Sequence, residues 1–437
     1  MKKLIYILLI LTLSVSFVAC GNSVEAVEDT ENEVVKGSIT VQAETAWIPY
    51  YEAAIERVKA KYPEADISIM EAGVFDHLGV LDSTDPSNPD VADVFALGLD
   101  NVKKYEKSAV VTAIDAKRIV DELGGYDDFD GMFANMLKVE DAYYAMPYNI
   151  ETLVVFANKA NAQAHGIDLE KTYAFEDLEA EDLLAVAHNA WFGLPFTNAV
   201  GIDLLAKDDQ GVLHSDLTKD FNQLTDEQQA MFVSLFDYWQ KHDALGTDLW
   251  DKEAAYGYLD SSIVTGGNTT FRIDGPWSTP SLVEKTDGGS DLAVLPINTI
   301  TVSGNPMAHW KGGWSLAANI RIEEDKNKML IAEELIKELL NPAYAVDLFQ
   351  TTGKILPNVD ASVYNASDLG DIDKAVITAV IDSYNVSADN PVIKEWDNVW
   401  GSWENAILSW SAIKPASVEE AYSEIQASFK AMMATFQ

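Results

Sequence analysis

The N-terminal part of the chain alternates between strand-like and helix-like patterns, and this alternation limits the folds open to it. Residues 38–42 alternate in polarity like a strand, and apolar residues then recur at helical spacing over 48–62. Pro63 ends that helix, residues 67–70 form a second strand pattern, and 91–97 is a short apolar run typical of a buried parallel strand. This order predicts an α/β fold with a doubly wound sheet.

The same alternation continues through the chain, whose 437 residues correspond to two domains, or three at most. Hydrophobic residues make up 48% and charged residues 23%, which excludes disorder for most of it. Further strands are predicted at 143–147, 152–157, 271–274, 291–296 and 315–320, and further helices at 178–187, 225–242, 327–340, 397–411 and 417–436.

Charge and cysteine content exclude several functional classes. Lys and Arg number 30 and Asp and Glu 70, which gives a formal net charge of −40. A surface this negative repels phosphate backbones, so we expect no nucleic-acid partner. The single cysteine excludes a disulfide framework and a cysteine-based zinc site.

The first residues have the pattern of a targeting segment. Lys2 and Lys3 precede a mostly apolar stretch over 4–18, and the only cysteine, Cys20, lies where a secretory signal would be cleaved. This arrangement resembles a bacterial lipobox, although an ordinary signal peptide with an incidental cysteine is the simpler alternative. We predict a signal peptide at 1–19, lipidation of Cys20 and an acidic linker to residue 36, which would anchor an exported protein at the outer face of the cell membrane.

Motifs for catalysis and for metal binding are mostly absent from the sequence. It has no nucleophile elbow, no P-loop and no dinucleotide fingerprint, and no two of its six histidines have helical ligand spacing. The acidic segments 208–211 and 287–291 fit turns better than calcium loops. We therefore expect neither a cofactor nor a metal. A glycosidase, which needs only two suitably spaced carboxylates, stays open at this point.

Aromatic residues next to predicted strand ends provide the strongest functional signal. Trp277 and Trp314 follow glycine-containing turns, and Glu44 and Trp47 follow the first strand. In open α/β sheets ligands bind beyond the strand ends, and an indole face beside carboxylates suits a neutral sugar. Tryptophans within periodic helical runs are instead predicted to be core residues: Trp239, Trp250, Trp396, Trp403 and Trp410.

From about residue 37 to 436 the chain resembles the extracellular solute-binding proteins of ABC importers, in particular the maltose/maltodextrin-binding type. The matching motifs lie at 93–96, 142–158, 274–277, 292–296, 311–320 and 341–353. Two segments depart from the maltodextrin pattern. Ala96 and Leu97 stand where that type has a tryptophan, and 193–198 has no Glu-Pro-Tyr triplet.

The resemblance implies a type II periplasmic-binding-protein fold, in which two lobes enclose a ligand cleft. The first lobe would comprise 37–149 plus 299–341, and the second 150–298 plus 342–437. Three crossings, near 149–151, 297–300 and 341–343, would form the hinge.

The resemblance also implies roles for individual residues. By position, Glu151 and Asp100 would bond sugar hydroxyls, and Trp277, Trp314 and Trp400 would stack on sugar rings. Glu44 and Trp47, taken from the strand-end pattern, complete the predicted site.

These observations predict a monomeric, lipid-anchored receptor without enzymatic activity. It would capture a sugar, such as a maltodextrin, by hinge closure and deliver it to an ABC transporter permease. Two alternatives remain open from the sequence: a tethered glycosidase or lyase, and a binding protein for another solute such as a polyamine or a peptide.

Overall fold

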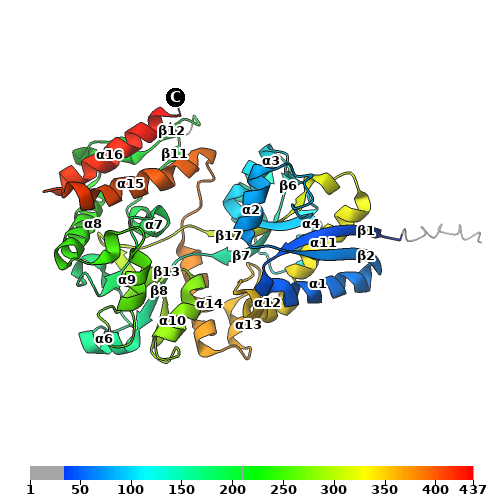
Figure 1. The fold of residues 1–437 in the computed structure, drawn as a ribbon, viewed down its shortest axis with the longest axis horizontal. Coiled ribbons are helices and arrows are strands. Elements are labelled where there is room, and N and C mark those ends of the chain that lie inside the picture. The colour runs from blue at the N-terminus through cyan, green and yellow to red at the C-terminus, as the bar shows by residue number, and fades with distance from the viewer. Residues whose placement is uncertain (1–33, 209, 437) are drawn as a thin grey trace, which may run out of the picture. The chain divides into compact units, whose positions relative to one another are not determined.

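The computed structural model describes residues 34–208 and 210–436, so the predicted signal peptide, Cys20 and most of the acidic linker lie outside the described residues. Within this part, two mixed sheets are each covered by helices (Figure 1). Among the described residues no helix is long and apolar enough to cross a membrane.

The first sheet has six strands in the order β2-β1-β3-β17-β4, with β7 also paired to β17. β1 is parallel to β2 and β3, and β17 runs antiparallel to β3, β4 and β7. The strands are β1 (Lys36–Ala43), β2 (Glu64–Glu71), β3 (Val94–Gly98), β4 (Val111–Thr112), β7 (Met146–Glu151) and β17 (Gly312–Asn319). The C-terminal half of the chain thus supplies a strand to the sheet that the N-terminus begins.

β3 shows why this sheet needs helices on both faces. Val94 and Ala96 belong to the core that contains α1 (Ile48–Lys61) and α11 (Lys326–Leu339). Phe95 and Leu97 belong to the core on the opposite face, with residues of α2 (Val74–Ser83), α3 (Val102–Lys107) and α5 (Phe129–Leu137). A strand that is buried on both faces gives the continuous apolar run predicted from the sequence.

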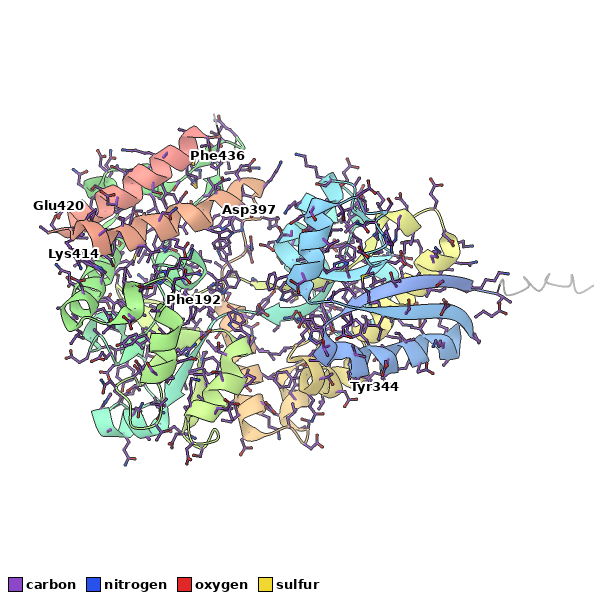
Figure 2. The ribbon with its side chains drawn as sticks, viewed as in Figure 1. Phe192, Tyr344, Asp397, Lys414, Glu420 and Phe436 are labelled. Carbon is purple, nitrogen blue, oxygen red and sulfur yellow. The ribbon has the colours of Figure 1, made fainter. Side chains whose placement is uncertain are left out.

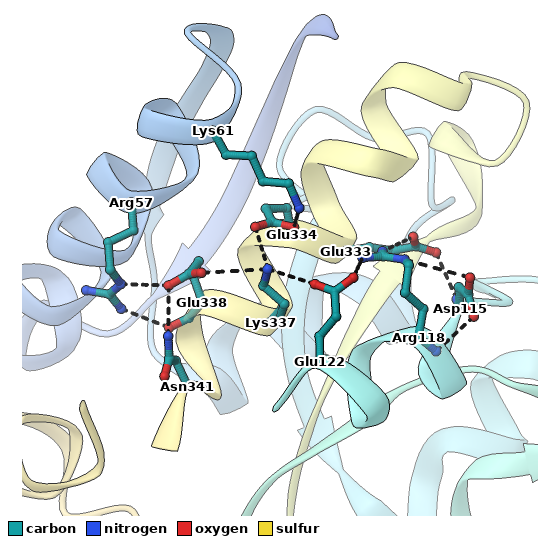
Figure 3. Close-up of polar contacts among 10 residues, drawn as sticks. All are labelled: Arg57, Lys61, Asp115, Arg118, Glu122, Glu333, Glu334, Lys337, Glu338 and Asn341. Carbon is teal, nitrogen blue, oxygen red and sulfur yellow. Dashed lines mark hydrogen bonds and ion pairs between the residues drawn. The ribbon is translucent and has the colours of Figure 1, made fainter. Parts of the chain in front are cut away.

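Ion pairs join α11 to the helices beside it (Figure 3). Glu334 and Glu338 accept bonds from Lys61 at 2.7 Å and from Arg57 at 2.8 Å, both on α1. On α4 (Ala116–Leu123), Arg118 lies 2.7 Å from Glu333 of α11. These carboxylates are largely buried, so pairing them avoids the high cost of an isolated buried charge.

The second sheet has four strands in the order β10-β13-β8-β14. They are β10 (Leu183–Leu184), β13 (Phe271–Asp274), β8 (Val154–Asn158) and β14 (Leu292–Pro296). β8 is antiparallel to both of its neighbours, and β10 is parallel to β13. One helix, α14 (Asp371–Val386), packs against β14 and β8. Three others share a hydrophobic core with this sheet: α8 (Asp226–Leu245), α15 (Asp397–Ile413) and α16 (Val418–Ala434). Figure 2 shows the side chains, including Asp397 at the beginning of α15 and Glu420 in the first turn of α16.

The tryptophans predicted as core residues are buried, which confirms that prediction. Trp403 donates its indole N–H to the carbonyl of Ala187 at 2.8 Å, and Trp410 donates to that of Ala421 at 3.0 Å. Trp239, Trp250 and Trp396 are also buried. The indole N–H groups of Trp403 and Trp410 are thus paired, whereas those of Trp239, Trp250 and Trp396 have no hydrogen-bond partner among the described residues, so the burial of these three rings rests on apolar packing.

The predicted helix at 178–187 is wrong. The structure has an irregular segment there, followed by β10, whose two residues pair with β13. Residues 183–187 are all buried. This location beside β13 favours extended backbone over the helical preference of the Leu, Ala and Glu residues, because local propensity is weaker than tertiary packing.

α12 (Ala345–Thr352) packs against α1, whereas α14 packs against β14 and β8. The lobe boundaries remain a prediction, and these contacts favour a third crossing after α12 over one at 341–343.

The remaining elements are α6 (Lys159–His165), α7 (Ala190–Ala199), α9 (Ala255–Ser262), α10 (Thr279–Lys285), α13 (Ala361–Asn365), β5 (Lys138–Val139), β6 (Ala142–Tyr143), β9 (Tyr173–Ala174), β11 (Ala206–Lys207), β12 (Leu213–His214), β15 (Ile300–Val302) and β16 (Asn305–Pro306).

Candidate functional site

A cavity of about 270 Å³ lies where β7 and β17 meet the end of β3, and we call it the aromatic cavity. Aromatic rings and carboxylates share its wall, which is the combination predicted from the sequence for sugar recognition. Among its lining residues, those that we consider as ligand contacts are Phe75, Asp100, Glu151, Trp191, Trp314 and Asn390.

A pair of glycines fixes the geometry of this wall. Gly312 pairs with Glu151 and Gly313 with Ile150 across β7 and β17, and the register shifts directly after Trp314. A Cβ on Gly313 would lie 2.0 Å from the carbonyl oxygen of Asn149, and the φ of Gly313 is +148°. Only glycine permits this close approach, which places Glu151 and Trp314 on the same cavity wall.

Glu151, the last residue of β7, is partly buried. Burial raises the pKa of its carboxyl group, while the positive charge of Lys354 and a hydrogen bond from Asn149 act in the opposite direction. A carboxylate in this setting can accept hydrogen bonds from hydroxyl groups that enter the cavity.

Lys354 is a functional candidate that the sequence did not reveal. Its side chain is only 7% exposed, and its ammonium nitrogen lies 4.6, 5.1 and 5.6 Å from the ring centroids of Trp47, Tyr148 and Trp314. Burial lowers the pKa of Lys354 to about 8, and the negative charges of Glu151 and Glu44 oppose that shift. Three aromatic faces thus partly replace the water around a buried cation.

Trp47 and Glu44 do not line the aromatic cavity. Trp47 is buried and stacks on Tyr51, with ring centroids 6.2 Å apart. Glu44 is partly exposed and accepts a bond from the backbone N–H of Val74, at 3.3 Å, where α2 begins. Both residues therefore act on the site indirectly. Trp47 contacts Lys354, and Glu44 binds the start of α2 and places a negative charge near Lys354.

Asp100 and Trp400 meet at a second cavity, of about 210 Å³, which lies beside the first. Asp100 follows β3 and lines both cavities. Its surroundings raise the pKa of its carboxyl group, chiefly through desolvation and also through the charge of Asp397. Trp400, on α15, is half-buried, and its ring centroid lies 6.4 Å from that of Trp191.

Trp277 lines neither of these two cavities and is 49% exposed. It follows β13 directly after the Gly-Pro turn, as predicted, and its ring covers Gly275, where a Cβ would lie 2.1 Å from the indole. The structure therefore brings together Glu151, Asp100 and Trp314, places Trp400 beside them, and leaves Trp277 on the surface.

Two further aromatic residues of the wall were missed. Phe75 is 77% exposed and meets Trp314 edge to face, with centroids 5.4 Å apart. Trp191 lies in the first turn of α7, and its ring centroid lies 4.3 Å from that of His309. Trp191 does not follow a Gly-containing turn, so the signal that identified Trp314 could not identify it, whereas Phe75 follows Gly73 at the turn between β2 and α2 and was overlooked.

The described part of the chain contains no group of three or more His, Cys, Asp or Glu side chains that could hold a metal ion. The acidic segment 287–291 forms turns, in which Ser290 donates to the carboxylate of Asp287 at 3.1 Å. The recognition chemistry of the aromatic cavity therefore consists of aromatic rings, carboxylates, amides and ammonium groups.

Comparisons with known proteins identify a family and a fold. The sequence pattern of the family described as bacterial extracellular solute-binding protein matches residues 80–376. No curated protein sequence matches the chain. The maltose-binding periplasmic protein MalE of Listeria monocytogenes, solved with maltose, superposes with a TM-score of 0.70 at 16% identity, over 92% of this chain and 99% of that one. MalX of Streptococcus pneumoniae, solved with maltopentaose, gives a TM-score of 0.67 at 17% identity, over 90% and 99% of the two chains. At these identities the likeness establishes the two-lobed fold.

Proposed function

Because the chain belongs to the bacterial extracellular solute-binding proteins, a class of binding proteins rather than enzymes, we propose that it captures an oligosaccharide for an ABC importer. In this proposal the sugar lies in the aromatic cavity. The permease receives the ligand, and lipidated Cys20 holds the receptor at the outer face of the cell membrane.

One observation carries the choice of a sugar: three aromatic rings and two carboxylates line a single cavity. Phe75, Trp191 and Trp314 offer apolar faces for the C–H groups of a pyranose, and Asp100 and Glu151 offer acceptors for its hydroxyls. The structural neighbours that were solved with maltose and maltopentaose support the same ligand class.

Capture would follow from closure of the two lobes around the ligand. We place the first lobe at 37–149 plus 311–352, and the second at 150–310 plus the rest of the chain. The first change extends the expected boundary through α12, and the second follows from β15, which pairs with β9 and packs in the core of the second sheet. A ligand that contacts both lobes favours the closed form by its differential affinity for that form. Trp191 would supply a contact from the second lobe, Trp400 would contact the part of the ligand that reaches the neighbouring cavity, and Trp277 would reach the ligand only after closure.

A thermal-unfolding panel tests the proposal. Maltotetraose, tetragalacturonate, spermidine and a short peptide are each added to the protein without its signal peptide. At least one sugar should raise the melting temperature, because a ligand at 100 times its Kd stabilises the folded state by about 2.7 kcal/mol. If spermidine or the peptide raises it and neither sugar does, the proposed ligand class is wrong.

A further inference from the structure

Five lysines line the second cavity, which we call the lysine-lined cavity. Three of them lie on α3, one ends β11 and one lies in the short 3-10 helix before α15. They are Lys103, Lys104, Lys107, Lys207 and Lys394. Segments far apart in sequence thus direct their positive side chains to one cavity.

This concentration stands out in a chain with 30 basic and 70 acidic residues. Of the five lysines, Lys104 forms an ion pair with Asp82, at 3.5 Å. Within residues 34–208 and 210–436 none of the other four has a carboxylate at ion-pair distance. Two acids line the same cavity, Asp100 and Asp397, so positive groups outnumber negative ones by three. The local charge is therefore opposite in sign to that of the whole protein.

The lysine-lined cavity also contains aromatic surface. Trp396 and Trp400 both line it, with ring centroids 6.0 Å apart. An indole face beside several ammonium groups suits a ring that carries an anionic substituent better than it suits a free inorganic ion. The same cavity disfavours binding of a polyamine, because the positive charges of the polyamine would lie beside unpaired lysines.

The two cavities are neighbours. Asp100, Asn101 and Asn390 line both of them, so a ligand longer than one sugar ring can reach from one to the other. The aromatic cavity offers carboxylate acceptors for hydroxyl groups, and its one lining lysine, Lys311, is paired with Asp389 at 2.9 Å. The lysine-lined cavity offers ammonium donors for negative oxygen atoms. This division matches an oligosaccharide in which neutral and charged groups occupy different positions.

We propose that the ligand is an acidic oligosaccharide, whose carboxylate or sulfate groups bind in the lysine-lined cavity while part of its sugar backbone occupies the aromatic cavity. This inference rests on the proposed function and narrows it. It explains how an acidic protein can take up an anionic solute: the positive cavity lowers the electrostatic cost at the site itself.

Titration calorimetry with matched ligands tests the inference. The ligands are tetragalacturonate, its fully methyl-esterified form, a heparin-derived sulfated tetrasaccharide and maltotetraose. We expect tetragalacturonate or the sulfated tetrasaccharide to bind at least ten-fold more tightly than both neutral ligands, since charge-assisted hydrogen bonds are roughly twice as strong as neutral ones. Which of the two anionic ligands binds identifies the acid group.

Two variants with a matched control locate the effect. Lys103→Gln and Lys394→Gln should each weaken binding of the anionic ligand by roughly three- to ten-fold, and raising NaCl from about 50 to about 500 mM should weaken it further through screening. Lys117→Gln, an exposed lysine of α4 that lines neither cavity, should change nothing.

Each contrary result has a distinct meaning. If maltotetraose or the methyl ester binds as tightly as the anionic ligands and both variants leave affinity unchanged, the inference is overturned and the sugar receptor stands. If none of the four sugars binds, the proposed function and the inference fail together.

Discussion

In the aromatic cavity two of the ligand-facing groups lie on paired strands, whereas the lysines of the lysine-lined cavity are mostly exposed. Glu151 and Trp314 are fixed by the pairing of β7 with β17, and Lys354 is buried behind them among three rings. Four of the five lysines of the second cavity are exposed, and Lys103 is half-buried. The β7–β17 wall of the first cavity is therefore part of the fold, and the lysines of the second cavity can change without altering the fold.

This difference predicts where substitutions will cost stability and where they will change only affinity. Groups held by backbone pairing are preorganised, so the protein loses little entropy when the ligand binds. Exposed lysines lose side-chain freedom on binding but attract an anion over a longer range. We therefore expect the aromatic cavity to determine where the sugar backbone lies, and the lysine-lined cavity to select ligands with negative charge.

The largest expected effect is on folding. Gly313→Ala would place a methyl group 2.0 Å from the Asn149 carbonyl, so β7 and β17 would have to separate. We expect the free energy of unfolding to fall by about 3 kcal/mol or more, measured by chemical denaturation.

Gly257→Ala is the matched control for this substitution. Gly257 lies within α9, and nothing is within 4 Å of its added Cβ, so this variant should be neutral or up to about 1 kcal/mol more stable. Equal stability of the two variants would contradict the fixed frame of the aromatic cavity.

The second effect depends on pH and tests the buried cation. The folded protein releases the Lys354 proton at a pKa of about 8, whereas the unfolded chain holds it up to the ordinary value of 10.5. The unfolded state thus binds more protons in this interval, so the stability of the wild type relative to Lys354→Met should rise from about pH 8 to about pH 10.5, by up to roughly 3 kcal/mol.

Urea denaturation of both proteins across this range measures the difference. Between about pH 6 and pH 7 the lysine is charged in both states, so the stability difference should be constant there. A difference that stays constant up to pH 10 would show that Lys354 is not desolvated in the folded protein.

A smaller effect concerns ligand affinity. Glu151→Gln keeps the size of the side chain but removes a charged acceptor, and we expect affinity for the sugar to fall about ten-fold, consistent with the loss of one charge-assisted hydrogen bond. In the wild type, affinity should fall as the pH decreases through the raised pKa of Glu151, which lies above the usual 4.5.

The pH profile separates this role from a purely structural one. Glu151→Gln should lose that pH-dependent decrease, whereas Glu52→Gln, an exposed residue of α1, should retain it. Calorimetry at several pH values would contradict the assignment if both variants kept the wild-type profile.

The same contrast between the cavities explains what the sequence could reveal. Trp314 and Glu151 lie in short motifs next to strand ends, where neighbours in sequence are also neighbours in space. Capping signals likewise located the start of α8, where Thr225 and Gln228 bond reciprocally. Such local signals predicted the longer strands of both sheets, five helices (α1, α8, α11, α15 and α16) and the position of Trp314, but not Phe75 or Trp191 of the same wall.

The features that the sequence did not predict depend on contacts between segments that are distant in the chain. Lys103, Lys207 and Lys394 become neighbours only through the fold, and no spacing rule connects them. Lys354 looks like an ordinary lysine after a helix, and only its three surrounding rings reveal its burial. The false helix at 178–187 has the same origin, because pairing with β13 determined its backbone.

The central claim is that the aromatic cavity binds a sugar, and calorimetry on Trp314 variants tests it most directly. With the sugar that gives the largest thermal shift, Trp314→Ala should bind at least about ten-fold more weakly than wild type, and Trp314→Phe should bind with intermediate affinity, because stacking scales with the aromatic face retained. Circular dichroism should confirm that both variants are folded. Wild-type affinity in both variants would show that the sugar binds elsewhere and would contradict the account.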